Sequence, residues 1–375
     1  MKVLSVFGTR PEVIKLAPVI HRLQQSPGVE HVLCSTGQHR RMLDQVTSTF
    51  DLKPDVELNV MRPDQDITHI TTAVLDGVSE VIRATTPDWV VVQGDTTTCF
   101  AAALAAFYQK TRVAHVEAGL RTGNLASPWP EECNRRLVSI LADLHFAPTD
   151  IASTNLRAEG ISPDRIVVTG NTVIDALLFA LGKIKTSPAL LAEFRSSFDF
   201  LDEGRRLILV TGHRRENLGS RMEDVCQALS DLAARPDVQI VFPVHLNPQV
   251  QTTVRRALLD KSNVKLLDPL EYLPFVYLME RAYLIISDSG GIQEEAPALG
   301  KPVLVTRDTT ERPEAVAAGT AKLVGTSSAD IVREANKLLD DAEAYDLMAR
   351  ARNPFGDGHA AERIVSRLTA VDPRS

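Results

Sequence analysis

The segment LIISDSGGIQEE at Leu284–Glu295 decides the fold prediction, because it joins an apolar run to a helical pattern through two adjacent glycines. A strand that is apolar throughout is typical of a parallel sheet covered by helices on both faces. The start of the chain repeats this plan: Val3–Phe7 is a strand candidate, and Gly8 precedes a helical pattern that begins near Glu12. Both segments predict strand–turn–helix units of an α/β fold.

Short β-branched runs alternate with longer amphipathic stretches along the chain, as in βαβ units. The strand candidates of the first half are Val3–Phe7, His31–Ser35, Trp89–Gln93, Arg112–Val116, Leu144–Ala147 and Ile166–Thr169. Those of the second half are Leu207–Thr211, Gln239–Phe242, Val264–Leu267, Leu284–Ser287, Val303–Val305 and Lys322–Val324. The helical candidates include Glu12–Gln25, Ile67–Ala84, Met222–Ala234 and Ile331–Leu339. We expect two doubly wound Rossmann-like domains, residues 1–170 and 171–359, followed by a helix in 360–375 that could pack on either.

Composition narrows the class of protein. A chain of 375 residues suits two domains, and 44% hydrophobic with 24% charged residues is typical of a soluble globular protein. The net charge of -7 argues against general nucleic-acid binding, although a local pocket can still be positive. The four cysteines form no CxxC pair, so we expect neither a zinc site nor a disulfide framework. Without a signal peptide or a membrane-length apolar run, we expect a cytoplasmic protein.

A ligand of such a fold binds at the carboxyl ends of the strands, in the cleft between domains. After the strand Leu284–Ser287, the glycines Gly290 and Gly291 leave backbone N–H groups bare at the start of a helix. This pattern favours a phosphate held without metal; the alternative is a plain turn in which Ser289 caps the helix. Glu295 could accept two ribose hydroxyls, and Arg312 could contact a phosphate through its planar guanidinium.

The first βα turn carries two basic residues, Arg10 and Lys15. They would direct a positive field at an anionic substrate or at a neighbouring catalytic carboxylate; otherwise they are solvated charges of a surface turn. His213 follows the first strand of the second half and could donate to a leaving phosphate, or it could be a structural histidine.

Three carboxylates follow strands or begin a helix in the first half. Asp95 comes after Trp89–Gln93, Glu117 comes after Arg112–Val116, and Glu131 stands one helical turn before Arg135. Two carboxyl groups in a partly dry site can divide their protonation into one acid and one base. Each alone would more often be a cap or a salt-bridge partner. Neither a metal-ligand cluster nor a nucleophile motif is visible, so the pattern indicates anion recognition with acid–base residues.

At these residues the chain resembles the bacterial non-hydrolysing UDP-N-acetylglucosamine 2-epimerases from end to end. The matching segments are FGTRPE at 7–12, GDTTT at 94–98, HVEAGLRTG at 115–123, SPWPEE at 127–132, GNTVIDAL at 170–177, TGHRRENLG at 211–219, PVHLNP at 243–248, SDSGGIQEEAPALGKPVL at 287–304 and RDTTERPEA at 307–315.

The resemblance implies a glycosyltransferase-B architecture and a last helix that crosses back onto the first domain. It implies epimerisation at C2 of UDP-N-acetylglucosamine through elimination of UDP to 2-acetamidoglucal and re-addition, supplying surface polysaccharide synthesis. Asp95, Glu117, Glu131 and His213 would be catalytic. The substrate and UDP would contact Arg10, Lys15, Arg135, Phe275, Ser289, Gly290, Gly291, Glu295 and Arg312.

The family resemblance further implies a homodimer that uses neither metal nor nicotinamide. It also implies activation by substrate at a second site, near Gln38 and His39. Three alternatives stay open: a UDP-sugar glycosyltransferase of the same fold, a hydrolysing 2-epimerase that releases free sugar, and a non-catalytic nucleotide-sugar sensor.

Overall fold

The computed structural model describes residues 1–37, 40–62, 65–212 and 219–371. The chain divides into two compact units: Met1–Phe179 together with Phe355–Ser375, and Ala180–Pro354. The first division lies within helix α7, which spans Thr172–Thr186, and therefore beyond the boundary placed at residue 170 from the sequence. The last helix, α16, belongs to the first unit.

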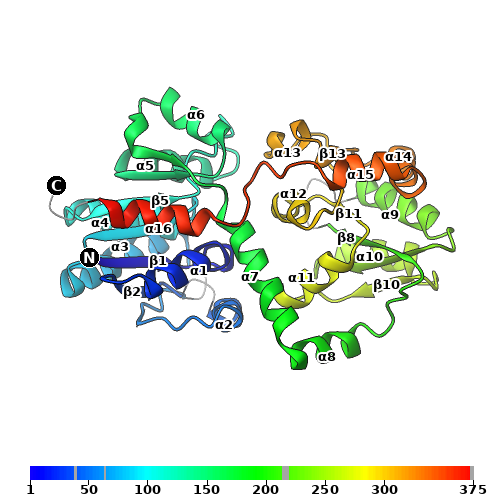
Figure 1. Cartoon of the computed structure of the whole chain (residues 1–375), viewed down its shortest axis with the longest axis horizontal. Helices are drawn as coiled ribbons and strands as arrows, with labels where there is room; N and C mark the ends of the chain where they lie inside the picture. Colours follow the sequence, from blue (N-terminus) through cyan, green and yellow to red (C-terminus); the bar gives the residue numbers. More distant parts are fainter. Residues whose placement is uncertain (38–39, 63–64, 213–218, 372–375) are drawn as a thin grey trace. The chain divides into compact units, whose positions relative to one another are not determined.

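The first unit contains one parallel sheet. Its elements up to α7 are β1 (Lys2–Phe7), α1 (Arg10–Gln25), β2 (Glu30–Ser35), α2 (Arg40–Thr49), β3 (Val56–Glu57), α3 (Ile67–Thr85), β4 (Trp89–Gln93), α4 (Thr97–Tyr108), β5 (Arg112–Val116), α5 (Glu131–Leu141), β6 (Leu144–Ala147), α6 (Asp150–Ala158), a 3-10 turn (Pro163–Arg165) and β7 (Ile166–Val168). Helix α16 (Ala360–Ala370) completes the unit. The strands lie in the order β3-β2-β1-β4-β5-β6-β7. Figure 1 labels β1, β2 and β5 of this sheet.

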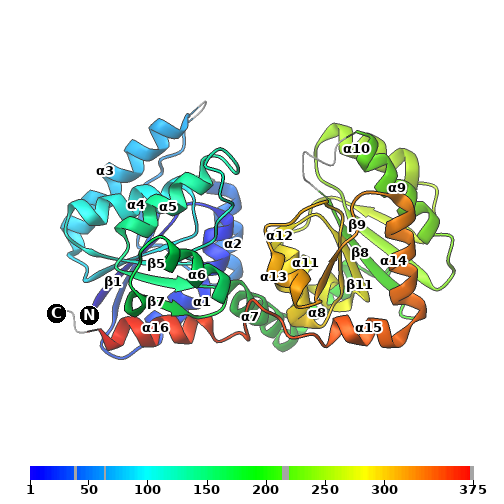
Figure 2. The same ribbon diagram turned by 90° about the horizontal axis from the view of Figure 1, so that it is seen from above.

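Helices cover both faces of this sheet (Figure 2). On one face, α3, α4 and α5 pack on the buried valines of β4 and β5. On the other, α16 packs along α1 and buries Ile364 and Leu368 completely. Because both faces are covered, strand β4 is buried along its whole length and is apolar up to its last residue, Gln93. Strands are added on one side of β1 up to β3 and on its other side from β4 onward, so the loops after the parallel strands β1 and β4 diverge at the point where ligands bind in such sheets.

The second unit repeats this order with one strand fewer. Its elements after α7 are α8 (Pro188–Ser197), β8 (Arg206–Thr211), α9 (Ser220–Leu232), β9 (Val238–Pro243), α10 (Pro248–Leu258), β10 (Val264–Leu267), α11 (Tyr272–Arg281), β11 (Leu284–Ser287), α12 (Gly290–Glu295), a 3-10 turn (Ala296–Leu299), β12 (Val303–Val305), α13 (Pro313–Ala317), β13 (Ala321–Leu323), α14 (Ser328–Asp340) and α15 (Ala342–Ala349). The sheet order is β10-β9-β8-β11-β12-β13, all parallel. In this sheet, the order in which strands are added changes direction between β8 and β11.

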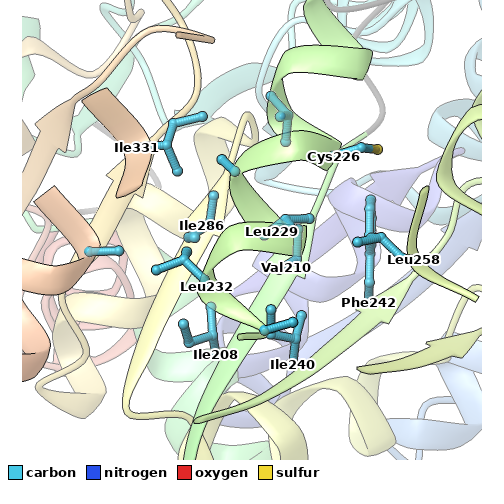
Figure 3. Packing of buried hydrophobic residues seen from close by; sticks show 14 of the residues in the cluster. Ile208, Val210, Cys226, Leu229, Leu232, Ile240, Phe242, Leu258, Ile286 and Ile331 are labelled. Atoms are coloured by element: carbon cyan, nitrogen blue, oxygen red, sulfur yellow. The ribbon is translucent and has the colours of Figure 1, made fainter. Parts of the chain in front are cut away.

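One apolar cluster holds this unit together (Figure 3). Helix α9 lays Leu229 and Leu232 against the β-branched side chains of the central strands, such as Ile208 and Ile240. Helices α10 and α14 extend the cluster on either side of α9. The rigid sheet therefore fixes the positions at which the loops after β8 and β11 begin.

The predicted α/β class with two doubly wound sheets is confirmed. Every strand predicted from the sequence is present within one residue of its predicted ends. Strand β3 was not predicted, because two residues are too few to show a strand pattern. Across the described ranges, no helix is long and apolar enough to cross a membrane.

Candidate active site

In the first unit, the loop after β1 packs directly on the start of α4. A Cβ atom added to Gly8 would lie 2.3 Å from the Oγ1 atoms of both Thr36 and Thr98, so only glycine fits there. The Thr96 hydroxyl, which belongs to the loop after β4, donates to Glu12 Oε1 over 2.7 Å. The loops after β1 and β4 are therefore fixed to each other by packing and by a hydrogen bond.

Glu12 is the buried carboxylate in this contact, with no exposed surface. Its Oε2 atom accepts from the backbone N–H groups of Gly8 and Thr9 at 3.0 and 2.7 Å. Burial raises the pKa of Glu12 to about 7, although the hydrogen bonds from Thr96 and from these N–H groups oppose the rise. Glu12 thus shapes the loop that carries Arg10 and is a titratable group close to neutral pH.

Glu117 follows β5, and three side-chain donors converge on its carboxylate. Lys15 forms an ion pair with Oε1, Asn171 Nδ2 donates to the same oxygen over 2.9 Å, and Gln93 Nε2 donates to Oε2. The Glu117 backbone has a φ of 64°, in the left-handed region that few residues other than glycine adopt. Such a conformation persists only where its surroundings hold it in place, which is common at catalytic positions.

His115 links the strand that precedes Glu117 to the loop that precedes Asp95. Burial lowers the pKa of His115 to about 4, so its ring is neutral at pH 7. Its Nε2 atom lies 2.7 Å from the carbonyl oxygen of Gly94 and donates to it. This bond ties β5, just before Glu117, to the loop after β4, just before Asp95.

Asp95 forms an ion pair with Arg135, and its carbonyl oxygen accepts from Asn134 Nδ2 over 3.0 Å. Both partners lie on α5. Arg135 also contacts Glu132 at 3.3 Å, and the fully buried Glu132 accepts the backbone N–H groups of residues 122 and 123. Of the two adjacent glutamates, Glu132 therefore holds the loop structure. Asp95 and Glu117 each carry a basic partner at neighbouring strand ends.

Glu131 and Arg10 have a different environment from these pairs. Glu131 is the first residue of α5, and Arg10 is the first residue of α1. Within the described part of the chain, neither side chain forms a hydrogen bond or an ion pair, and both are partly exposed. The structure thus places Glu131 one turn from Arg135, as the sequence indicated, but shows no contact that joins it to Asp95 or Glu117.

In the second unit, the glycines after β11 lie inside the first turn of α12, rather than before the helix as the sequence suggested. Both have ordinary φ angles. A Cβ atom added to Gly290 would lie 3.8 Å from its nearest neighbour, and one added to Gly291 would lie 3.7 Å away. Neither the backbone nor the packing therefore requires glycine at these two positions. Gly290 is buried and Gly291 is partly exposed, and the Ser289 N–H donates to Ser287 Oγ over 3.0 Å. Ser289 makes no side-chain capping bond.

Arg312 lies beside this turn, because the nearest neighbour of a Cβ atom added to Gly290 would be Arg312 Cζ. Glu294, 1% exposed, forms an ion pair with Arg312 Nε. Gln293 donates to the carbonyl oxygen of Ser289 over 3.1 Å and accepts from the Thr310 hydroxyl over 2.6 Å. The loop that carries Arg312 is thereby fixed to the glycine turn.

Glu295 ends helix α12 and is 8% exposed. Its Oε1 atom accepts from the Tyr272 hydroxyl over 2.9 Å. Tyr272 begins α11, and Phe275 stands one turn further along the same helix, partly exposed. The second unit thus gathers a glycine turn, a guanidinium and a buried carboxylate. His213, Gln38 and His39 lie outside the described residues.

A family model for UDP-N-acetylglucosamine 2-epimerases matches residues 21–369. The chain is 55% identical to the UDP-N-acetylglucosamine 2-epimerase of Escherichia coli strain K12 over 369 residues, 98% of each chain. The chain belongs to the UDP-N-acetylglucosamine 2-epimerase family. Epimerases are isomerases, so the predicted enzyme class is confirmed.

Solved structures of this epimerase family support the fold. The UDP-GlcNAc 2-epimerase from Neisseria meningitidis, solved bound to UDP-GlcNAc, matches with a TM-score of 0.91 and 52% identity over 99% of this chain and 100% of that one. The Methanocaldococcus jannaschii enzyme, solved with UDP-GlcNAc and UDP, matches with a TM-score of 0.81 and 34% identity over the same shares. These matches confirm the predicted glycosyltransferase-B-like class.

Several residues around the candidate site were not predicted from the sequence. Gln93, Asn171, Tyr272 and Glu294 hold candidate site residues in place. Gln93 precedes the Gly94-Asp95 turn and could have been suspected as a polar residue ending an apolar strand. Nothing local marks Asn171, whose partner is far away in sequence. No cluster of three or more potential metal ligands occurs among the described residues.

Proposed function

We propose that the protein interconverts UDP-N-acetylglucosamine and UDP-N-acetylmannosamine by eliminating UDP and adding it back, without hydrolysing the substrate. The observation that carries this proposal is the pair Asp95 and Glu117, at neighbouring strand ends and each bound to a basic side chain. The pair occurs in a chain that aligns over nearly its full length with enzymes named for this reaction.

The reaction explains why two acids and a leaving-group site would be needed together. No carbonyl is attached to C2 of the sugar, so removing its proton alone would form a poorly stabilised carbanion. If the C2–H electron pair forms the C1=C2 double bond while the C1–O bond breaks, UDP leaves with the other pair. The product is 2-acetamidoglucal. Returning a proton to the opposite face of C2 while UDP adds to C1 gives the epimer.

The first unit would supply the proton transfers. Asp95, Glu117 and Glu131 form the proposed acid–base set, since a positioned acid or base contributes about 10²- to 10⁴-fold to a rate. Lys15 and Arg135 hold two of these carboxylates in defined positions. Arg10, partly exposed at the start of α1, would contact the substrate's anionic group. His213 is proposed to assist the leaving diphosphate.

The second unit would keep UDP bound between the two half-reactions. Ser289, the N–H groups of Gly290 and Gly291 and the guanidinium of Arg312 would contact the diphosphate, which a helix start and a planar guanidinium suit. Glu295, oriented by Tyr272, would accept the ribose hydroxyls, and Phe275 would contact the nucleoside. Retention of UDP is what separates this reaction from hydrolysis.

Incubation with UDP-N-acetylglucosamine alone in heavy water tests the proposal. We expect UDP-N-acetylmannosamine labelled with deuterium at C2, detected by NMR, with deuterium also entering the recovered substrate. Accumulation of UDP with free N-acetylmannosamine would instead establish a hydrolysing enzyme. Sugar transfer that requires an added acceptor would establish a glycosyltransferase, and binding without turnover would establish a sensor.

The proposal extends to assembly and supply. We propose a homodimer in the cytoplasm, activated by substrate near Gln38 and His39, whose product feeds surface polysaccharide synthesis. Light scattering on the purified protein measures the assembly directly: a mass of one chain contradicts it. A hyperbolic rate curve that does not change when Gln38 or His39 is replaced by alanine contradicts the second site.

A further inference from the structure

Two distant segments of the chain touch beside the candidate active site. The segment at Gly170 enters α7, through which the chain leaves the first unit, and the segment at Phe355 is where the chain returns to it. A Cβ atom added to Gly170 would lie 3.2 Å from Gly356 Cα and 3.3 Å from the Phe355 carbonyl oxygen. Both glycines have positive φ angles, 88° and 126°. The two segments therefore cross with no room for side chains between their backbones.

Asn171 links this crossing to the catalytic candidate Glu117. Its backbone N–H donates to the Phe355 carbonyl oxygen over 2.6 Å, and its Nδ2 donates to Glu117 Oε1 over 2.9 Å. Its Oδ1 accepts from Val173 N over 3.1 Å, which fixes the amide with its NH₂ group toward the carboxylate. Asn171 is 2% exposed, so all three bonds are made away from water.

The returning segment is itself held firmly in the first unit. Asp175 accepts from the N–H groups of Ala360 and Ala361 at 3.2 and 2.9 Å, which fixes the start of α16. Phe355 is 1% exposed. A shift of this segment would therefore move Asn171 through its backbone and Glu117 through the amide.

We propose that Asn171 is a positioning residue for the epimerisation, which orients the Glu117 carboxylate and couples that orientation to the crossing of the two segments. This inference rests on the proposed role of Glu117. Among the described residues, Gln93, Lys15 and Asn171 bind the Glu117 carboxylate and set its direction. Asn171 is the one of the three that lies at the crossing.

Replacement of Asn171 by serine separates positioning from a purely structural role. Serine can still cap the start of α7 but is too short to reach Glu117. We expect Asn171→Ser to lower kcat by about 10- to 100-fold, as expected for loss of a hydrogen bond to a charged group, with KM and UDP affinity changed less than threefold. The rate of deuterium entry at C2 should fall in parallel. Unchanged kcat would overturn the proposal.

Asp175→Ala is the matched control, since it disturbs the same crossing without contacting Glu117. We expect a lower melting temperature and a loss of kcat clearly smaller than that of Asn171→Ser, because the Asn171 amide can still donate to Glu117 in this variant. An equal loss of kcat in this variant would assign the Asn171 effect to general disturbance of the crossing and overturn the proposal.

A double variant distinguishes this inference from the proposed function. If Asn171 acts through Glu117, adding Asn171→Ser to Glu117→Gln should reduce kcat by less than threefold beyond the single variant. Losses that multiply would overturn the inference and leave the role of Glu117 intact. Full activity of Glu117→Gln would remove the proposed role of Glu117 itself, and the inference with it.

Discussion

The two units share one architecture but equip the same edge of the sheet in opposite ways. In the first, the loops after β1, β4 and β5 lead into carboxylates that partly buried partners hold in place. In the second, the loop after β11 offers peptide N–H groups and a guanidinium fixed by Glu294. The doubly wound sheet thus determines the edge at which a ligand binds. The few residues after each strand determine whether that edge transfers protons or binds an anion.

The largest expected effect would come from removing a carboxylate of the first unit. Asp95→Asn and Glu117→Gln should each lower kcat by about 10²- to 10⁴-fold, because the amide cannot accept a proton. UDP affinity, measured by calorimetry, should stay within about threefold. Near-normal turnover in both variants would contradict the proposal that the first unit supplies the proton transfers. Glu80→Gln, which changes an exposed carboxylate on α3, serves as the control.

Glu12 would show what burial of an acid at this edge does to stability. Its folded-state pKa of about 7 lies above the ordinary value of 4.5. The proton therefore favours folding: this contribution is complete below pH 4.5 and is lost as the pH rises through about 7. Glu12→Gln stays neutral at every pH. Relative to the native chain, its free energy of unfolding should increase by about 2–3 kcal/mol between pH 5 and pH 8.

Denaturant unfolding at several pH values measures this difference between the native chain and Glu12→Gln. For the same Glu80→Gln control, the free energy of unfolding should change with pH as it does for the native chain. A constant difference across the pH range would show that Glu12 does not titrate in it.

A bulky side chain in the glycine turn should affect binding alone. Gly290→Val would cover the N–H groups of the turn, and losing one or two bonds to a charged phosphate corresponds to about 10- to 100-fold weaker UDP binding. Gly182→Ala, at a site in α7 with no neighbour within 4 Å, is the matched control. Unchanged UDP affinity of Gly290→Val would contradict the proposal that the diphosphate binds at this turn.

The smallest expected effect concerns Tyr272. Tyr272→Phe removes one hydrogen bond to Glu295 and should weaken UDP binding about two- to tenfold. If Glu295 accepts ribose hydroxyls, the loss should disappear with 2′,3′-dideoxy-UDP. An equal loss with both nucleotides would mean that Tyr272 acts on the structure of the helix and not on ribose recognition.

The sequence predicts the part of this molecule that depends on local chemistry. The apolar run of β4 and the glycine turn at Gly290 are visible without a structure, because a strand covered on two faces and a pair of glycines each leave a pattern within a few residues. Asp95 and Glu117 could be singled out as residues that follow strands. Their partners could not, since pairs such as Asn171 with Glu117 depend on how distant segments pack.

Glu12 shows the same difference between what local sequence predicts and what depends on packing. Its position suggests a carboxylate that begins a helix, whereas its complete burial and its bond to Thr96 follow from the packing of two loops.

The return of the chain to the first unit has a practical consequence for recombining or truncating the gene. Because α16 packs on α1 and Asp175 binds its first turn, a stop codon after Phe179 would remove a helix that helps to bury α1 in the first unit. An independently produced first unit must join Met1–Phe179 to the segment that starts at Phe355. Chimeras that exchange the second unit need two junctions, one near Phe179 and one near Phe355.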